Sequence, residues 1–120
     1  MPTLELTTNV KLDDPKAFIE EFSKFSAEVL GTPLAFTATS YTYNEYLAWE
    51  GTFEPAFILP VVSLRNINPE ANEVYSKKLF EFLQQKLGVS PKRGYISFID
   101  PGNSNLGYNF TTFGTIFGQK

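Results

Sequence analysis

The chain has 120 residues and a mass of 13.5 kDa, so a single domain over residues 1–120 is expected, and a doubly wound dinucleotide fold with a second substrate domain is excluded. Its 10 basic and 13 acidic residues give a net charge of −3, which argues against nucleic acid and anionic membranes as partners. Histidine and cysteine are both absent from the sequence, which excludes thiol nucleophiles, Ser-His triads, structural zinc sites and disulfide exchange.

The first residues of the chain carry no targeting signal. Met1 to Glu5 lack the basic and apolar segments of a secretory signal peptide, so the cytoplasm is the expected compartment, with export without a signal peptide as the alternative. The longest apolar run, 56–62, is far shorter than the ~20 residues of a membrane span. The α-amine of the chain is the one ordinary group whose pKa, roughly 8, lies near neutrality.

Two helices are predicted, and the same signals mark their ends. The first follows Asp14-Pro15 and ends at Gly31, and the second follows Asn68-Pro69 and ends at Gly88. Apolar side chains recur between these boundaries at steps of three and four residues. They are Phe18, Ile19, Phe22, Phe25, Val29 and Leu30 in the first helix, and Val74, Tyr75, Leu79, Phe82, Leu83 and Leu87 in the second.

Four strands are predicted around these helices, at 4–10, 35–43, 57–64 and 94–100. Pro60 lies inside the third and predicts an edge strand or a bulge, because proline has no N–H for a sheet ladder. The fourth is closed by the turn signal Asp100-Pro101-Gly102-Asn103. The apolar tail 106–113 predicts one further strand or two fragments.

The order of elements is strand–helix–strand, repeated once, which predicts an α/β (α+β) fold. Each β-α-β unit is expected to contribute two parallel strands with a right-handed crossover, so the domain is a four-stranded sheet with two helices on one face. Leu30-Gly31-Thr32-Pro33 and Leu87-Gly88-Val89-Ser90-Pro91 leave the two helices in a similar way. An internal duplication of about half the chain is the interpretation we favour.

The last two strands of the sheet are apolar on both faces, as in Ile58-Leu59 and Val61-Val62. Two helices cover only one face, so the other face is predicted to contact further subunits, as are the tail aromatics Phe110, Phe113 and Phe117. The alternative is a monomer in which these side chains are covered by its own loops. The pairs Lys77-Lys78 and Lys92-Arg93 are expected to be solvated surface and indicate no nucleic-acid site.

Several short motifs occur in an order and spacing typical of one family. They are Pro2 after the initiator Met, Thr8-Asn9-Val10, Glu54-Pro55-Ala56, Tyr75-Ser76-Lys77-Lys78-Leu79, Ser90-Pro91-Lys92-Arg93-Gly94-Tyr95-Ile96, Asp100 and Gly107-Tyr108-Asn109-Phe110-Thr111-Thr112-Phe113. Over nearly its whole length the chain resembles macrophage migration inhibitory factor and its relatives in the tautomerase superfamily.

The resemblance implies a homotrimer whose sheets line a central barrel, with a pocket at each subunit interface. It implies keto–enol tautomerisation of phenylpyruvate or dopachrome by an N-terminal proline, here Pro2, exposed when Met1 is removed. A small aromatic α-keto acid or a similar carbonyl compound is then the expected substrate, and no cofactor is needed. Certain animal members act as secreted cytokines, so a protein receptor is a further partner class that the resemblance implies.

The chemistry expected of Pro2 is general base catalysis. An apolar pocket disfavours the charged ammonium and lowers the pKa of a terminal amine toward neutrality. By position in the family, the pocket residues are Phe36, Leu64, Tyr95, Tyr108 and Phe113.

Two polar positions depart from the family pattern. Thr32 stands where the family has a lysine, and Ser97 stands where it has an asparagine. A neutral hydroxyl cannot neutralise a substrate carboxylate, so weak activity is expected unless Lys11 or Arg65 replaces the lysine.

Each of these residues also has a structural interpretation. Pro2 can start an edge strand, Tyr95 can be a core aromatic, Ser97 can fill a strand, and Thr32 can be a polar residue after a helix. Two functions therefore remain open: a tautomerase, and a non-catalytic or weakly active trimer that acts as a cytokine-like binding protein.

Overall fold

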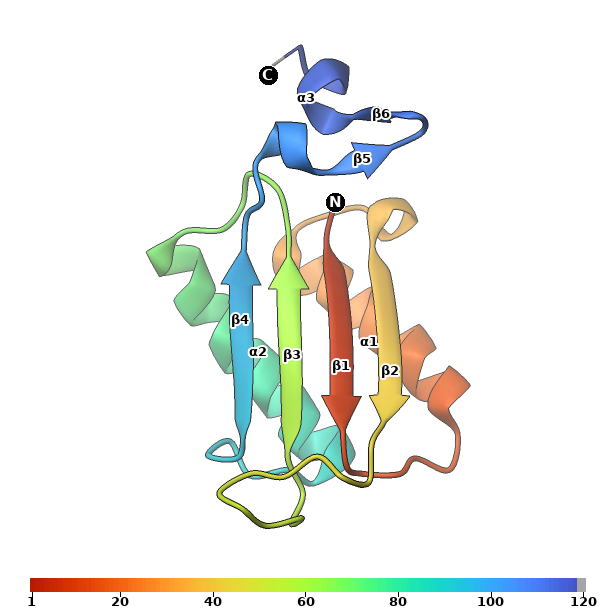
Figure 1. Cartoon of the computed structure of the whole chain (residues 1–120), viewed down its shortest axis with the longest axis vertical. Helices are drawn as coiled ribbons and strands as arrows, with labels where there is room; N and C mark the ends of the chain where they lie inside the picture. Colours follow the sequence, from red (N-terminus) through yellow and green to blue (C-terminus); the bar gives the residue numbers. More distant parts are fainter. Residues whose placement is uncertain (119–120) are drawn as a thin grey trace.

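The computed structural model describes residues 1–118, in which two β-α-β units form one four-stranded sheet with both long helices on the same face (Figure 1). This is the arrangement that the repeated strand–helix–strand order predicts. The six elements that build it are β1 (Thr3–Thr8), α1 (Pro15–Leu30), β2 (Ala38–Tyr43), β3 (Phe57–Val62), α2 (Pro69–Leu87) and β4 (Gly94–Ile99).

Both helices begin and end where the sequence predicts. The side chain of Asp14 accepts a hydrogen bond from the N–H of Ala17 at 3.1 Å, and Asn68 accepts one from Ala71 at 2.9 Å. At the other ends Gly31 and Gly88 adopt left-handed backbone with φ of 67° and 70°. Glycine reaches this conformation without the steric cost of a Cβ, so the two helices end by the same mechanism.

The strand order in the sheet is β2-β1-β3-β4. The strands within each unit are parallel, and the two units meet through the antiparallel pair β1 and β3, with Thr3 opposite Val62. The amino-terminal end of β1 therefore lies beside the carboxyl-terminal ends of β3 and β4. Residues from both halves of the chain meet at this end of the sheet.

The prediction of an edge strand or bulge at Pro60 is wrong, because β3 is an interior strand. The sheet accommodates the proline by interrupting the ladder between β1 and β3. β1 and β3 are paired at Leu4–Val61 on one side of Pro60 and at Thr7–Ile58 on the other. No pair with β1 is formed at Pro60 itself, which has no N–H to donate.

Boundaries of all four strands also differ from prediction, and β1 runs from Thr3 to Thr8 where 4–10 was predicted. Leu34–Phe36 form the 3₁₀ helix η1, in which the N–H of Phe36 bonds to the carbonyl of Pro33, so β2 begins only at Ala38. β3 and β4 end at Val62 and Ile99, before the predicted residues 64 and 100. There the carboxylate of Asp100 accepts the N–H of Arg65 at 3.0 Å, which draws the chain into a turn.

The core lies between the helices and the sheet. It is made of the inward-facing strand residues Leu4, Leu6, Phe57, Leu59 and Val61 and the helix residues Phe18, Phe22, Leu30, Tyr75, Leu79, Phe82, Leu83 and Leu87. Val74 was also expected on this face but is 49% exposed. Its neighbour Tyr75 takes the inward direction, one residue and about 100° further around the helix, and donates a hydrogen bond to the carbonyl of Asn66 at 2.8 Å.

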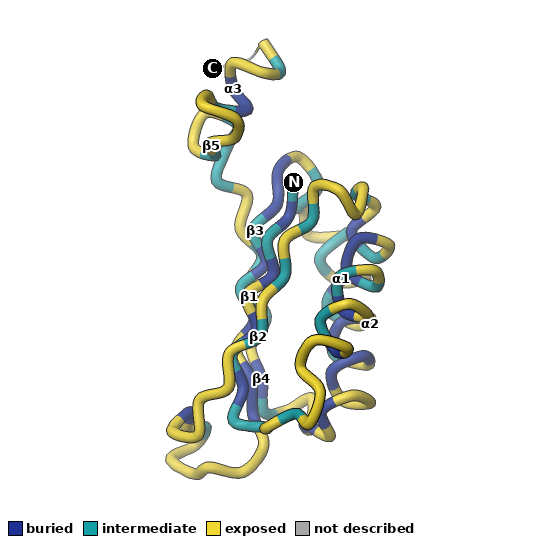
Figure 2. The backbone as a smooth tube through the Cα atoms, turned by 90° about the vertical axis from the view of Figure 1, so that its right-hand side faces the viewer, coloured by how far each residue is buried: buried dark blue, intermediate teal, exposed yellow. Residues whose placement is uncertain are grey.

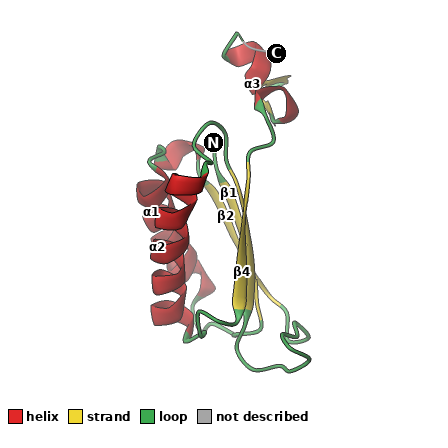
Figure 3. Cartoon of the chain, turned by 90° about the vertical axis from the view of Figure 1, so that its left-hand side faces the viewer, coloured by secondary structure: helices red, strands yellow, loops and turns green. Residues whose placement is uncertain are grey.

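The opposite face of the sheet carries no helix among the described residues (Figures 2 and 3). On β3 and β4 it presents Ile58, Tyr95 and Ile99, which are 45%, 71% and 45% exposed. We call this apolar area the open face. A sheet this apolar on its uncovered side is typical of a chain that packs against another surface.

Arg93 is not the solvated surface cation that the Lys92-Arg93 pair predicts. Its guanidinium donates to the carbonyls of Trp49, Glu54 and Pro55 and to the hydroxyl of Thr52, at 3.0–3.2 Å. The loop before β3 is therefore fastened to the start of β4, and the ring of Trp49 lies 4.4 Å from that of Tyr95.

The apolar tail was predicted to form one further strand or two fragments, and it forms two short strands. The 3₁₀ helix η2 (Asn103–Asn105), β5 (Gly107–Tyr108), β6 (Thr111–Thr112) and α3 (Phe113–Ile116) extend beyond the end of the sheet that carries the N-terminus, on the side away from the helices (Figures 1 to 3). Phe110 is fully exposed, as expected, but Phe113 is buried because it stacks between Tyr108 and Phe117. No helix in residues 1–118 is long and apolar enough to cross a membrane.

Candidate functional site

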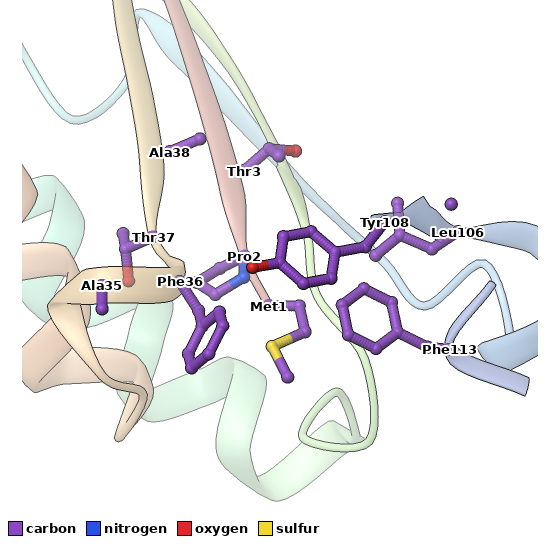
Figure 4. A pocket seen from close by; sticks show the side chains of 11 residues that line it. Met1, Pro2, Thr3, Ala35, Phe36, Thr37, Ala38, Leu106, Tyr108 and Phe113 are labelled. Atoms are coloured by element: carbon purple, nitrogen blue, oxygen red, sulfur yellow. The ribbon is translucent and has the colours of Figure 1, made fainter. Parts of the chain in front are cut away.

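A pocket of about 270 Å³ lies between the end of the sheet and the C-terminal segment (Figure 4). Three separate stretches line it: the N-terminus, the turn before β2, and the strand β5 with the start of α3. The lining residues are Met1, Pro2, Thr3, Ala35, Phe36, Thr37, Ala38, Leu106, Gly107, Tyr108 and Phe113. Four of the residues predicted from the sequence, Pro2, Phe36, Tyr108 and Phe113, are thus brought together from distant parts of the chain.

Pro2 is fully buried at this pocket. Its carbonyl accepts a hydrogen bond from the N–H of Ala38 at 3.0 Å, which ties the start of β1 to β2. Met1 precedes Pro2 in the described chain, so the Pro2 nitrogen is an amide there. Removal of Met1 converts that nitrogen into a secondary amine at the same place.

The pocket is a weakly polar environment for an amine. Aromatic rings form one wall, with Tyr108 edge-on to Phe36 at 6.1 Å and stacked on Phe113 at 5.5 Å. Burial lowers the pKa of the Met1 α-ammonium below its ordinary value, because the charged form loses solvation there. The Met1 amine is therefore shifted toward its neutral, basic form.

Thr32 lies at the edge of the pocket without lining it. Its hydroxyl is 3.3 Å from the hydroxyl of Thr37, which lines the pocket and itself donates to the carbonyl of Pro33 at 2.9 Å. This pair of hydroxyls carries no charge. Within residues 1–118 no group of three acidic, histidine or cysteine side chains is placed to hold a metal ion.

Comparisons with known proteins identify the family of this chain. The family model for macrophage migration inhibitory factor matches residues 1–114. A homologue of that factor from Trichinella spiralis is 33% identical over 114 residues, which cover 94% of this chain and all of the relative, and one from Trichuris trichiura is 34% identical with the same coverage. The chain belongs to the macrophage migration inhibitory factor family.

Solved structures of family members share the fold. The structure of the factor from Trichinella spiralis superposes with a TM-score of 0.86 at 32% identity, over 92% of this chain and 98% of that one. A homologue from Prochlorococcus marinus also gives 0.86, at 26% identity, over 93% and 99% of the two chains. The predicted family and its tautomerase-type fold are thus confirmed.

Four of the site residues expected for the family do not line this pocket: Thr32, Leu64, Tyr95 and Ser97. Tyr95 and Ser97 project from the open face of β4, and Tyr95 is opposite Ile58, which pairs with Thr7 near the far end of β1 from Pro2. Leu64 is buried just after β3, at the same end of the sheet as Pro2, but does not line the pocket. A second copy of the chain would have to supply Tyr95 and Ser97.

Several lining residues were not predicted from the sequence. Met1 and Thr3 flank Pro2, and their positions follow directly from its place in the pocket. Thr37 and Ala35 depend on η1, whose signal is Pro33 at the start of the turn. Leu106 depends on the path of the C-terminal segment, for which the sequence carries no local signal.

Proposed function

We propose that the chain is a cofactor-independent keto–enol tautomerase that acts on an aromatic α-keto acid of the phenylpyruvate type, with Pro2 as the general base. The observation that carries the proposal is the placement of Pro2, held by β2 at an apolar pocket with aromatic walls. Family membership supports the same reaction class.

The proposed reaction moves one proton. The neutral Pro2 amine takes the proton from the carbon next to the carbonyl, and the C–H electron pair moves toward the carbonyl to give an enolate. Protonated Pro2 then gives the proton to the enolate oxygen, which releases the enol and restores the base. No electron acceptor or metal takes part, which suits a chain without histidine or cysteine.

The proposed working form is a homotrimer in which Tyr95 and Ser97 of a neighbouring copy complete each pocket. The apolar open face supports association of this kind, because Ile58 and Ile99 lie on the same side of the sheet as Tyr95 and Ser97. Ser97 would donate one hydrogen bond to the developing enolate.

The proposal is tested with protein from which Met1 has been removed, as verified by intact-protein mass spectrometry. We expect the rate of phenylpyruvate enolisation to rise with pH and then level off, because only the neutral amine is a base. The midpoint should lie below the pKa of an ordinary terminal amine, because Pro2 is buried at an apolar pocket, where the charged ammonium is disfavoured.

Pro2→Gly should lower the rate strongly while leaving the assembly intact, because glycine replaces the nitrogen of the rigid proline ring with a primary amine on a flexible residue. The protein that keeps Met1, in which the Pro2 nitrogen is an amide and not a base, should be slower by at least a hundredfold, because general base catalysis contributes roughly 10²–10⁴ in rate. Undiminished turnover in Pro2→Gly would refute the assignment.

A second candidate is a trimer that binds a protein partner with little or no catalysis. Thr32 favours it, because the hydroxyl pair Thr32–Thr37 offers no charge for a substrate carboxylate. One measurement distinguishes the two functions. Phenylpyruvate turnover that is high without Met1 and low with Met1 indicates the tautomerase, whereas low turnover in both forms indicates the binding protein.

A further inference from the structure

Arg65 is a cation at the same end of the molecule as the pocket. It lies in the connection between β3 and α2, three residues after Val62, which is opposite Thr3 in the sheet (Figure 1). Its backbone is left-handed, with φ of 70°, a conformation that residues with a Cβ adopt at a cost. Sites of this kind persist where the surroundings hold them in place.

The surroundings of Arg65 do hold its backbone. The carboxylate of Asp100 accepts the N–H of Arg65 at 3.0 Å and, through its other oxygen, the N–H of Gly102 at 2.9 Å. The N–H of Ser63 also donates to the carbonyl of Ile99 at 2.9 Å. The segment that carries Arg65 is thus fixed to the segment that leads into the C-terminal wall of the pocket.

The side chain of Arg65 contacts the segment that forms that wall. Its guanidinium lies 4.9 Å from the centre of the Phe117 ring, and Phe117 stacks on Phe113 at 5.4 Å, which lines the pocket. Arg65 is exposed, and within residues 1–118 it forms no ion pair. Asp100 is occupied by backbone N–H groups, so the guanidinium has a ring beneath it and no carboxylate.

We propose that Arg65 is the cation that binds the carboxylate of the α-keto acid, in place of a lysine at position 32. This inference rests on the proposed function and adds its substrate-binding charge. A guanidinium binds a carboxylate through two parallel N–H···O bonds, an arrangement that is stronger than its contact with a half-buried ring such as that of Phe117. The flexible side chain can therefore leave Phe117 for a carboxylate at the pocket mouth.

The substitution that tests this is Arg65→Gln, which keeps a side chain at the strained position and removes the charge. Binding of 3-phenylpropanoate, an unreactive carboxylate, and of its uncharged amide is measured by calorimetry for both proteins. We expect Arg65→Gln to weaken binding of the acid about tenfold and to leave binding of the amide unchanged, because only the acid loses a charge-assisted contact. Turnover of phenylpyruvate should show a KM raised by a similar factor with kcat nearly unchanged.

Two comparisons make the result specific. Lys24→Gln removes an equal charge from the exposed side of α1 and should change neither affinity. Arg65→Lys keeps the charge without the planar fork and should retain part of the preference for the acid. The preference of the unsubstituted protein should shrink as ionic strength rises.

The proposal fails if the unsubstituted protein binds the acid no more tightly than the amide, or if Arg65→Gln weakens both equally. It also fails if Lys24→Gln has the same effect as Arg65→Gln. Failure of the proposed function is a separate result: the protein then turns over no phenylpyruvate, while the two binding experiments still decide whether Arg65 selects a carboxylate.

Discussion

At the scale of single residues, the polar groups at the edge of the pocket are uncharged hydroxyls. Thr32 and Thr37 form a hydroxyl pair at its edge, 3.3 Å apart, and the cation that we propose for it, Arg65, contacts the ring of Phe117 in the C-terminal segment. A charged donor to a carboxylate is roughly twice as strong as a neutral one. The identity of residue 32 is therefore expected to control affinity for acids and not the chemistry at Pro2.

We expect Thr32→Lys to lower the KM for phenylpyruvate by about tenfold with little change in kcat, because the new contact forms in ground and transition states alike. The gain should be larger in a chain that also carries Arg65→Gln, where the lysine replaces the cation that we propose. Steady-state kinetics with the acid and its methyl ester measure both effects. An equal improvement for acid and ester would show that the lysine acts through packing and not through charge.

Half of the expected site residues meet in one pocket within the chain, and these could be predicted from the sequence. Pro2, Phe36, Tyr108 and Phe113 meet in one pocket because β1, η1 and the C-terminal segment converge at one end of the sheet. Tyr95 and Ser97 are part of the same family pattern, but their strand places them on the open face. A linear pattern does not distinguish residues that meet within a chain from residues that meet between copies.

At the scale of elements, the start of β4 depends on the absence of a side chain. Gly94 is buried and directly opposite Phe57 in the pairing of β3 with β4. A Cβ built on Gly94 would overlap the ring of Phe57, which is 1% exposed in the core. Glycine is required at position 94 because the Phe57 ring approaches the backbone closely, and not because the backbone adopts a conformation that only glycine favours.

Gly94→Ala is expected to destabilise the protein by about 1–3 kcal/mol, since the Phe57 ring has to shift within a packed core. Urea unfolding at one protein concentration measures the change as a lower midpoint with an unchanged slope. Lys92→Ala, two residues earlier and exposed, is the control and should stay within about 0.5 kcal/mol of the unsubstituted protein. A Gly94→Ala midpoint equal to that of the control would contradict the steric explanation.

Elements with strong local signals could be predicted closely from the sequence. Asp14-Pro15 and Gly31 mark the ends of α1 because caps act within one turn of the helix. The edge strand or bulge predicted from Pro60 was wrong, because an interior strand tolerates a proline where the hydrogen-bond ladder to its neighbour is interrupted. The prediction that Arg93 is a solvated surface cation was also wrong. Its four acceptors lie in a loop about 40 residues earlier in the chain, so no local sequence pattern indicates them.

At the scale of the whole molecule, the two sides of the sheet differ in what covers them. The helices bury one side, and the other leaves Ile58, Tyr95 and Ile99 uncovered on adjacent strands. At about 25 cal/mol per Å² of apolar surface removed from water, covering such a face contributes several kcal/mol per copy. Association through this face also brings Tyr95 and Ser97 to another chain, so assembly and activity are expected to depend on each other.

The assembly prediction compares two apolar residues of similar exposure on opposite sides of the molecule. Ile58 is 45% exposed on the open face, and Val74 is 49% exposed on α2. The unsubstituted protein should scatter light with three times the 13.5 kDa mass of one chain. Ile58→Glu should give a smaller mass and lose phenylpyruvate turnover, because a carboxylate without a partner is costly to bury in an apolar contact. Val74→Glu should keep both mass and turnover, because its side chain stays in water. A single-chain mass for the unsubstituted protein at all concentrations, or equal behaviour of the two variants, would show that the open face is not where the copies meet.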